Sequence, residues 1–425
     1  MPAVQPQQHE SLSVGRCTLN LYFRAGSLVL HQGSASIFNS NVKQNVKYTF
    51  ENCSIPVVVT STARLDVEGE FTYSETILSS DVFNLHCILD TVRANAALLY
   101  KQTYPDGYDG THAMDTAVAL RGPRVIVIGD QNTGKSSLCR SLINLAVKAE
   151  SESKVVFVDL DIGQQSVSCP GSLSAAFMES QIPIDEGLNA VMPLTFFFGD
   201  ITVSVQSRKR YLDACAVLCD AVNSVLERDE GFGNGGLVIN TMGWITNLGK
   251  DLLMELCSIF SVTHIVVTGS DSDLETAAKT ATALQSGVEV LRFPRITTLM
   301  KRGGTSLANS RTSQLVRYFS GTTRTPLSPC RAVVKVADVF FFNAVTLQPM
   351  TWKEVPANSL AAVVWCDSED QLAETNVAGY IVLLEVGKQY VSFLAPASGD
   401  LPKPYILVSP TLKLPVSKVP PINMH

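Results

Sequence analysis

The sequence predicts an α/β protein whose central P-loop NTPase domain contains a doubly wound parallel sheet. An N-terminal β-sandwich and a small C-terminal β-rich domain flank this centre. Apolar strand-like runs alternate with helical stretches in the middle of the chain, and closely spaced β-rich runs precede and follow it. A chain of 425 residues is too long to form a single hydrophobic core, since domains average about 150 residues. We therefore place the domains at 1–110, 111–328 and 329–425.

The first region carries short β-rich runs between Cys17 and Tyr73, separated by Gly and Asn residues. This spacing is typical of an antiparallel sandwich or barrel. From Val82 to Leu98 the apolar spacing becomes helical. Residues 101–115 are rich in turn formers, so we expect them to link the first domain to the second.

A phosphate-binding loop is the strongest signal in the chain. The apolar run Val125 to Ile128 predicts a buried strand, the motif G-x-x-x-x-G-K-S follows it, and a helix is expected from about Ser136 to Lys148. Glycines let the loop curl until its backbone N–H groups point at phosphate oxygens, and the helix N-terminus adds positive potential. The residues expected to bind ATP are Gly129, Asn132, Thr133, Gly134, Lys135, Ser136 and Ser137.

A second apolar run, Val155 to Val158, ends in Asp159-Leu160-Asp161. This strand brings a carboxylate to the sheet edge beside the phosphate-binding loop, which is the Walker B arrangement. We expect Asp161 and the Ser136 hydroxyl to hold Mg²⁺, and Asp159 to point away from the metal.

The rest of the central domain continues the alternation of strands and helices. Later strands are expected at 237–241, 264–269 and 288–293, and helices at 211–227 and 274–285. Ligands of such sheets bind at the carboxyl ends of the strands. A final set of β-rich runs, from Ala332 to Leu414, predicts the third domain.

Composition restricts the classes of function. Hydrophobic residues make up 46% of the chain and charged residues 17%, and no apolar run is long enough for a membrane span. We therefore expect no membrane partner. The net charge of −6 gives no global attraction for nucleic acid, so any RNA contact is expected to be local. The ten cysteines are scattered, and Cys215 and Cys219 are expected to be core residues.

Taken together, these features resemble the eukaryotic polyribonucleotide 5′-hydroxyl kinase family of pre-mRNA 3′-end cleavage, a subunit of cleavage and polyadenylation factor that is also found with the tRNA-splicing endonuclease. The resemblance runs along nearly the whole chain. It is carried by RGPRVIVIGDQNTGKSSLCR, VDLDIGQQSVSCPGS, INTMGWI, RTSQLVRYFSG, and NVAGYIVLLEV with VSFLAPASGDLPKPYILV. The resemblance implies ATP and Mg²⁺ as cofactors, a nuclear location, and as partners other cleavage and polyadenylation subunits, RNA 5′ ends or the tRNA-splicing endonuclease.

The same resemblance assigns roles to single residues. Asp161 corresponds to the carboxylate near the attacking 5′-hydroxyl. Gln164 lies beside it near the metal and is expected, with Trp244, to bind RNA. Trp244 matches an aromatic residue that packs on the terminal base of the RNA, and its alternative role is that of a core tryptophan. Arg311 matches a lid arginine that neutralises charge on the moving phosphoryl group, which makes Lys135, Asp161 and Arg311 the candidate catalytic residues.

The chain also departs from the family pattern. The lid pattern R-x-x-x-R retains only Arg311, with Leu307 at the other position, and Arg302 or Arg317 is either a substitute or a surface charge. A Pro-Gly clasp expected to embrace RNA is missing from 199–206. Near the nucleotide base, an acidic residue and a Lys of the family are replaced, with Arg16 and Ile55 near those positions.

Two hypotheses follow. The chain is an ATP-dependent polynucleotide 5′-hydroxyl kinase of mRNA 3′-end processing, or it is an ATP-bound scaffold that docks cleavage-factor partners. Both hypotheses require the intact phosphate-binding loop. They differ in the lid and the clasp, whose altered residues favour the scaffold. A GTPase is disfavoured because no N-K-x-D guanine-binding motif follows a later strand.

Overall fold

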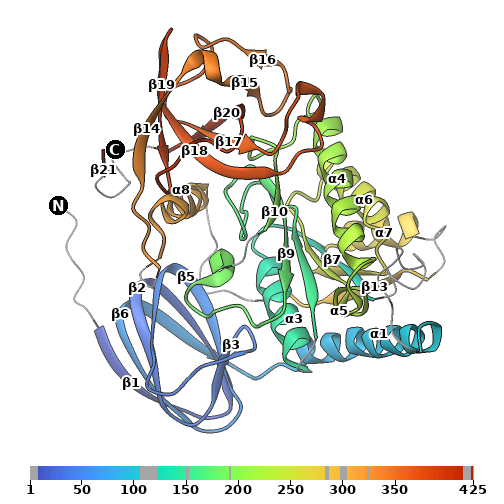
Figure 1. The fold of residues 1–425 in the computed structure, drawn as a ribbon. Helices are drawn as coiled ribbons and strands as arrows, with labels where there is room; N and C mark the ends of the chain where they lie inside the picture. Colours follow the sequence, from blue (N-terminus) through green and yellow to red (C-terminus); the bar gives the residue numbers. More distant parts are fainter. Residues whose placement is uncertain are drawn as a thin grey trace.

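The computed structural model describes residues 8–105, 122–149, 153–190, 193–282, 287–296, 304–322, 325–414 and 423–424. Within them lie three separate sheets, of six, seven and eight strands in chain order (Figure 1). The seven-stranded sheet occupies the centre of the chain and carries the phosphate-binding loop. The predicted α/β class with β-rich flanks is therefore confirmed, while the domain boundaries after residues 110 and 328 stay predictions.

The N-terminal sheet is antiparallel, in the order β1-β6-β2-β5-β3-β4. Alternate apolar side chains of this sheet point inward and form one core, and the single sheet curls around it. This curled sheet occupies the part of the chain for which the sequence predicts a β-sandwich. The runs expected as separate strands between 18 and 33 form one long strand, because a register shift at residues 23–25 bends it without ending it. The strands are β1 (Gln8–Val14), β2 (Cys17–Gln32), β3 (Ala35–Ile37), β4 (Ser40–Asn41), β5 (Lys47–Val59) and β6 (Ala63–Thr76).

The helix predicted near 82–98 is α1, Asp81–Thr103. Its buried side chains Leu85 and Leu89 pack with Leu138 and Leu142 of the central region and not with the N-terminal sheet. The start of the predicted linker, Lys101 to Thr103, belongs to this helix, and residues 106–115 lie outside the described part of the chain.

The central sheet has the order β10-β9-β8-β11-β7-β12-β13. Its last five strands are parallel, whereas β9 and β10 pair antiparallel and extend one edge, which the sequence did not indicate. The strands are β7 (Arg124–Gly129), β8 (Val155–Asp159), β9 (Ser172–Met178), β10 (Leu194–Phe197), β11 (Leu237–Asn240), β12 (His264–Thr268) and β13 (Glu289–Phe293).

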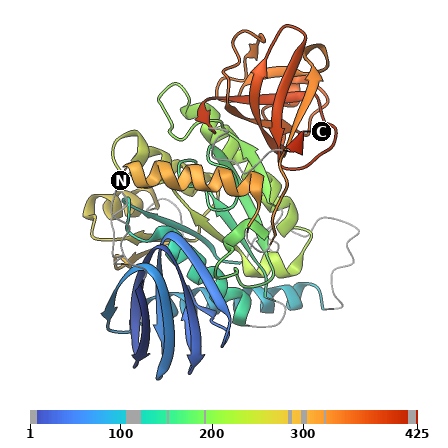
Figure 2. The same ribbon diagram turned by 90° about the vertical axis from the view of Figure 1, so that its left-hand side faces the viewer.

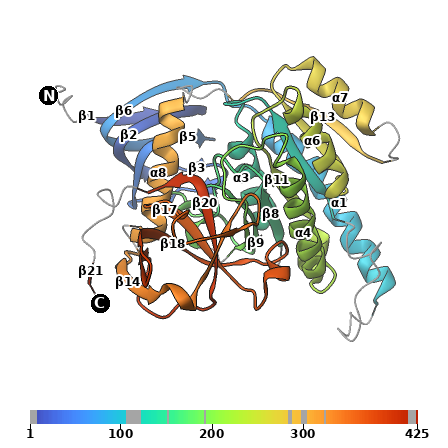
Figure 3. The same ribbon diagram turned by 90° about the horizontal axis from the view of Figure 1, so that it is seen from above.

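Helices cover both faces of this sheet. Alternate strand residues belong to two different cores, one beneath α1 and α3 and the other beneath α4 to α7, as a doubly wound sheet requires (Figure 3). Cys215 and Cys219 are buried in the second core, as expected. The helices are α3 (Lys135–Ala149), α4 (Arg208–Leu226), α5 (Glu230–Gly235), α6 (Leu248–Ile259) and α7 (Ser272–Thr282), with a short 3₁₀ turn at Gly187–Ala190.

The C-terminal sheet has the order β16-β15-β20-β17-β18-β19-β14-β21 and buries apolar residues on both faces. One face packs on helix α8, Gly304–Ser320, which lies between the N-terminal and C-terminal sheets (Figure 2). The strands are β14 (Cys330–Lys335), β15 (Phe340–Asn343), β16 (Pro349–Met350), β17 (Ser359–Val364), β18 (Val377–Val386), β19 (Tyr390–Ala395), β20 (Tyr405–Lys413) and β21 (Asn423–Met424), with 3₁₀ turns at Val336–Asp338 and Glu369–Gln371.

All ten cysteines lie in the described ranges, and no disulfide bond joins any of them. Among the helices in the described ranges, none combines the length and the apolar character that a membrane crossing needs.

The N-terminal sheet is fastened to the phosphate-binding helix by Asn144, a fully buried residue of α3. Its Nδ2 donates to the carbonyl oxygen of Phe38 at 2.7 Å, and its Oδ1 accepts from the backbone N–H of Ile182 at 2.8 Å. One amide side chain therefore joins three segments that are distant in sequence.

We expect Asn144→Ala to lower the thermal unfolding midpoint, because it leaves a buried carbonyl and a buried N–H without their partner. Each unsatisfied group costs about 1–3 kcal/mol. Asn84→Ala, at an exposed position of α1, is the matched control and should change stability by less than about 0.5 kcal/mol. Equal midpoints for the two variants would show that Asn144 does not fasten the sheet.

Candidate functional site

The phosphate-binding loop has the curled backbone that its glycines permit. Gly129 has φ +152° and Gly134 has φ +92°, both in the region that side chains disfavour. A Cβ at Gly129 would lie 2.1 Å from Thr268 Oγ1, and one at Gly134 would lie 2.6 Å from Ile296 Cβ. These close approaches explain why a loop between β7 and α3 needs glycine at both ends.

Lys135 begins α3 and turns back over the loop. Its Nζ donates to the carbonyl oxygens of Gly129 at 2.8 Å and Asp130 at 2.9 Å. Burial lowers the pKa of Lys135, while the carboxylates of Asp161 and Asp130 oppose that shift. The ammonium group thus lies inside the loop, beside the position that phosphate oxygens would take.

The two carboxylates after β8 differ in their surroundings. Asp159 is fully buried and accepts hydrogen bonds from Asn240 Nδ2, from the backbone N–H of Asp161, and from the backbone and hydroxyl of Ser166. Asp161 Oδ1 accepts from the N–H groups of Gly163 and Gln164, both at 3.0 Å. Burial raises the pKa of Asp161, and Lys135 opposes the shift.

A cavity of about 620 Å³ joins most of the predicted site residues. Lys135, Asp161, Arg311 and Trp244 all line it. Asp159 does not, which agrees with the expectation that it points away. The other lining residues are Ser54, Asp130, Gln131, Asn132, Gly134, Ser136, Ser137, Ile162, Gly163, Gln164, Ile201, Thr202, Val203, Met242, Gly243, Ile245, Thr246 and Leu307.

Two residues predicted to bind ATP lie behind the cavity wall. Gly129 is at the end of β7, where its carbonyl oxygen accepts from Lys135. Thr133 is 5% exposed, and its hydroxyl contacts Thr268 Oγ1 at 2.7 Å and donates to the carbonyl oxygen of Asp130 at 2.9 Å. The Thr133 side chain therefore supports the loop, and only its backbone remains a candidate phosphate ligand.

Helix α8 presents Leu307 and Arg311 to the cavity from successive turns. Farther along α8, Gln314 Nε2 donates to the carbonyl oxygen of Ser168 at 2.7 Å, and Arg317 Nη2 donates to that of Asp185 at 3.1 Å. Arg317 is thus engaged outside the cavity and does not substitute for the missing lid arginine. Arg302 lies outside the described residues.

Trp244 lies in the loop after β11, against the first turn of α6. A Cβ at Gly249 would lie 2.5 Å from Trp244 Cγ, so the ring rests directly on the helix backbone. A Cβ at Gly243 would lie 2.7 Å from the side chain of Gln131, so this loop also packs on the phosphate-binding loop. Trp244 is therefore both partly buried and at the cavity surface.

Some lining residues were not predicted. Ser54 from β5 brings the N-terminal sheet to the cavity, although no local pattern marks a serine in a strand. Its neighbour Ile55 is 4% exposed in the N-terminal core, and the exposed Arg16 is absent from the lining. Residues 201–203, within the segment without the Pro-Gly clasp, also line the cavity.

The residues present fit a nucleotide-bound Mg²⁺. No described residue donates a hydrogen bond to Asp161 Oδ2, and the Ser136 side chain lines the same cavity. The described residues hold no cluster of three or more His, Cys, Asp or Glu that could bind a metal without other ligands. This donor set suits Mg²⁺, which is typically held by one or two protein oxygens together with phosphates and water.

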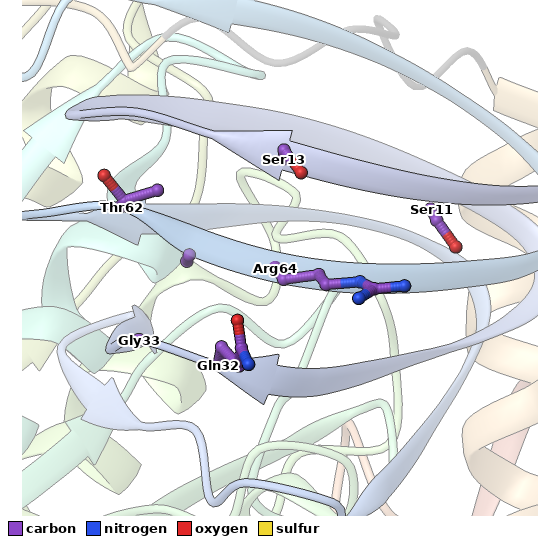
Figure 4. Close-up of a pocket in the computed structure, with 7 residues that line it drawn as sticks. Ser11, Ser13, Gln32, Gly33, Thr62 and Arg64 are labelled. Atoms are coloured by element: carbon purple, nitrogen blue, oxygen red, sulfur yellow. The ribbon is translucent and has the colours of Figure 1, made fainter.

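A second hollow, of about 540 Å³, lies on the outer surface of the N-terminal sheet. Figure 4 shows Arg64 on β6 between Ser13 of β1 and Gln32 of β2. It contains no residue of the phosphate-binding loop, so the cavity around Lys135 is the candidate active site.

Known proteins resemble this chain along most of its length. Residues 129–321 match the family model described as the mRNA cleavage and polyadenylation factor CLP1 P-loop. Protein CLP1 homolog of Nematostella vectensis is 28% identical over 416 residues, which cover 91% of each chain. The chain is thus similar to Clp1 proteins over most of its length, and its central region matches the Clp1 P-loop model.

Other Clp1 relatives give the same result. Polyribonucleotide 5′-hydroxyl-kinase Clp1 of Homo sapiens is 28% identical over 412 residues, covering 90% of each chain. A Clp1p chain solved in complex with Pcf11p has a TM-score of 0.79 at 18% identity, covering 96% of the present chain and 98% of that chain. This likeness shows that the Clp1 fold extends over all three sheets.

We expect Lys135→Ala to weaken ATP binding, because it removes a charged donor from the phosphate site. A hydrogen bond to a charged group contributes about 1.5–3 kcal/mol, and calorimetric titration measures the loss. Lys209→Ala, at an exposed position of α4, is the control and should bind ATP as the wild type does. Equal ATP affinity in both variants would contradict the site.

Proposed function

We propose that this Clp1-like chain is an ATP-binding subunit of the nuclear mRNA 3′-end cleavage and polyadenylation machinery that transfers the γ-phosphoryl group of ATP to the 5′-hydroxyl of RNA. The convergence of Lys135, Asp161, Arg311 and Trp244 on one cavity carries this proposal. The three charged residues match the charge requirements of phosphoryl transfer, and the Trp244 ring offers a surface on which a base can stack.

In the proposed reaction, the loop N–H groups and Lys135 bind the β- and γ-phosphates. The RNA 5′-hydroxyl oxygen forms a bond to the γ-phosphorus as the bond to the bridging oxygen of ADP breaks, and Asp161 accepts the hydroxyl proton. Two backbone N–H groups donate to Asp161 Oδ1 and thereby orient the carboxylate at the cavity. Arg311 stabilises the charge on the transferred group, and bound Mg²⁺ would supply further charge neutralisation at Ser136 and Asp161.

The second candidate function is an ATP-bound scaffold, and Leu307 is the observation that favours it. This side chain lines the cavity one helical turn from Arg311, where the family resemblance implies a second arginine. A leucine supplies no charge for the transition state. In addition, α8 contacts Ser168, Asp185 and the C-terminal core, so a bound nucleotide would stabilise several parts of the chain together.

The proposed partners follow from relatives. Clp1p has been solved in complex with Pcf11p, and a related structure addresses the extended interface of these two proteins and ATP loss in a point mutant. We propose that this chain binds a Pcf11-like subunit. The tRNA-splicing endonuclease is a further proposed partner, supported by the sequence resemblance alone.

Transfer from γ-labelled ATP to a 5′-hydroxyl RNA tests the kinase directly. Asp161→Asn should abolish transfer while ATP still binds, because the variant removes the proton acceptor and leaves the loop intact. Arg311→Ala should lower the rate by about 10³- to 10⁵-fold, the contribution of comparable arginines. Lys209→Ala is the activity control.

The outcome separates the two candidates. Transfer by the wild type that disappears in Asp161→Asn establishes the kinase. If the wild type transfers no label while ATP is bound and RNA is saturating, the scaffold remains and the kinase is rejected.

Leu307→Arg should raise the transfer rate, by about 10- to 10³-fold, because it places a second guanidinium on the cavity face of α8. Leu98→Arg, at an exposed position of α1, controls for added charge and should not change the rate. An unchanged rate in Leu307→Arg, at unchanged ATP affinity, would show that the missing arginine does not limit turnover.

A further inference from the structure

The phosphate-binding loop can offer its N–H groups to an anion only while its carbonyl groups point elsewhere, because carbonyl oxygens carry partial negative charge. From within the site, Lys135 holds the carbonyl oxygens of Gly129 and Asp130. The carbonyl groups of Asn132 and Thr133 are instead held by donors from outside the loop. The shape of the anion site therefore depends on a segment that is distant in the sequence.

The outside donors are Arg295 and Ile296, which follow β13 after a proline. Arg295 donates to the carbonyl oxygen of Asn132 from Nε at 3.2 Å and from Nη2 at 3.1 Å. The backbone N–H of Ile296 donates to the carbonyl oxygen of Thr133 at 3.1 Å. The Ile296 side chain also lies against Gly134, where a Cβ would be 2.6 Å from Ile296 Cβ. Two successive residues thus hold the loop from its outer side.

Asn132 is the position at which the loop most needs this support. Its φ of +58° lies in the left-handed region, and it is the only residue other than glycine in 129–136 with a positive φ. Asparagine tolerates this region better than most residues, but it still prefers a negative φ. The two donors of one guanidinium group hold the carbonyl direction that this backbone conformation produces. Without them, Asn132 can return to a negative φ, which changes the direction of the neighbouring peptide groups.

Arg295 is placed to support the loop and not to bind a substrate. Its side chain is exposed, and its only polar contacts with the described residues are the two to Asn132. It does not line the cavity. By contrast, Arg292, three residues earlier on β13, is paired with the carboxylate of Glu275 on α7. The guanidinium group of Arg295 therefore acts on the outer side of the phosphate-binding loop.

We propose that Arg295 is a positioning residue for the phosphates of the nucleotide. It captures the carbonyl group of Asn132 and thereby holds the phosphate-binding loop in its anion-binding shape before a nucleotide arrives. The inference rests on the ATP site of the proposed function and adds a residue that touches neither ATP nor the acceptor. An ordered loop loses less conformational freedom on binding, so the capture raises the affinity for any ligand whose phosphates occupy the loop.

Calorimetric titration of the nucleotide-free full chain tests this role, with ATP and inorganic tripolyphosphate as ligands in the presence of Mg²⁺ and without RNA. Arg295→Met removes the guanidinium group and keeps most of the aliphatic stem. It should weaken both ligands by the same factor, about 5- to 20-fold, as expected for loss of a charged donor at an exposed position. Arg295→Lys should lose less, because an ammonium group still donates to one carbonyl oxygen.

Arg292→Met is the matched control, since it removes the same charge from the same strand. It should bind both ligands as the wild type does. The titrations are repeated at about 50 and 500 mM KCl. A loss caused by missing positive charge alone shrinks when salt screens it, whereas a loss caused by a disordered loop persists.

A second variant links the effect to the backbone of Asn132. Glycine adopts a positive φ without steric cost, so Asn132→Gly should make the loop less dependent on Arg295. In the Asn132→Gly background, we expect Arg295→Met to weaken tripolyphosphate by less than about threefold. A residue that supported the fold without acting through Asn132 would give the same factor in both backgrounds.

The results distinguish this inference from the proposed function. Equal affinities of the wild type and Arg295→Met for both ligands overturn the inference and leave the ATP site intact. A loss confined to ATP also overturns it, because Arg295 would then act on the base or the sugar. A loss that disappears at high salt, or one that is the same in the Asn132→Gly background, has the same consequence. If the wild type binds neither ATP nor tripolyphosphate, both the inference and the proposed function fail.

Discussion

The geometry of the candidate site depends on one buried carboxylate. Asp159 accepts hydrogen bonds from three segments: the turn that carries Asp161, the end of β11 at Asn240, and the loop at Ser166. Burial, together with the neighbouring Asp161, raises its pKa to about 6, while the donors around it favour the charged form. A neutral side chain of the same size would attract these donors less strongly.

Each of the three segments leads to a different part of the site. The turn positions Asp161, and the end of β11 continues to Gly243 and Trp244. From Ser166 the loop runs to Ser168, whose carbonyl oxygen accepts from Gln314 of α8. Arg311 lies on the same helix as Gln314. The positions of Asp161, Trp244 and Arg311 therefore all depend on the hydrogen bonds that Asp159 accepts. The site is thus a connected unit of the fold, although its residues come from widely separated segments.

The sequence predicted those parts of the site whose function imposes a local pattern. The glycine spacing of 129–134, the lysine after it and the acidic end of β8 are readable because phosphate binding needs a particular backbone over a few successive residues. The strands β7, β8, β11 and β12 were readable because buried parallel strands form continuous apolar runs. Arg311 and Trp244 required a resemblance to a family, since a single arginine or tryptophan has no local signature.

Other features depend on tertiary contacts that leave no mark in the local sequence. Ser54 reaches the cavity because contacts such as those of Asn144 hold the N-terminal sheet against α3. The packing of α1 on the central core is of the same kind, since its apolar spacing predicts a helix but not the surface that covers it. The antiparallel strands β9 and β10 were missed because β9 (SLSAAFM) contains no β-branched residue and β10 (LTFF) has only four residues.

The central region cannot complete its fold alone, because helix α8 packs on the C-terminal sheet. Residues Leu315 and Phe319 of α8 are buried in the core beneath the C-terminal sheet, where Tyr318 Oη accepts a hydrogen bond from the backbone of Tyr380. A fragment that ended before this sheet would expose two large apolar side chains on the helix that carries Arg311. The smallest unit able to act on a nucleotide is therefore larger than the phosphate-binding sheet. Removal of the C-terminal sheet by proteolysis would therefore strip the packing from the helix that carries Arg311, while every residue of the phosphate-binding loop remained in the chain.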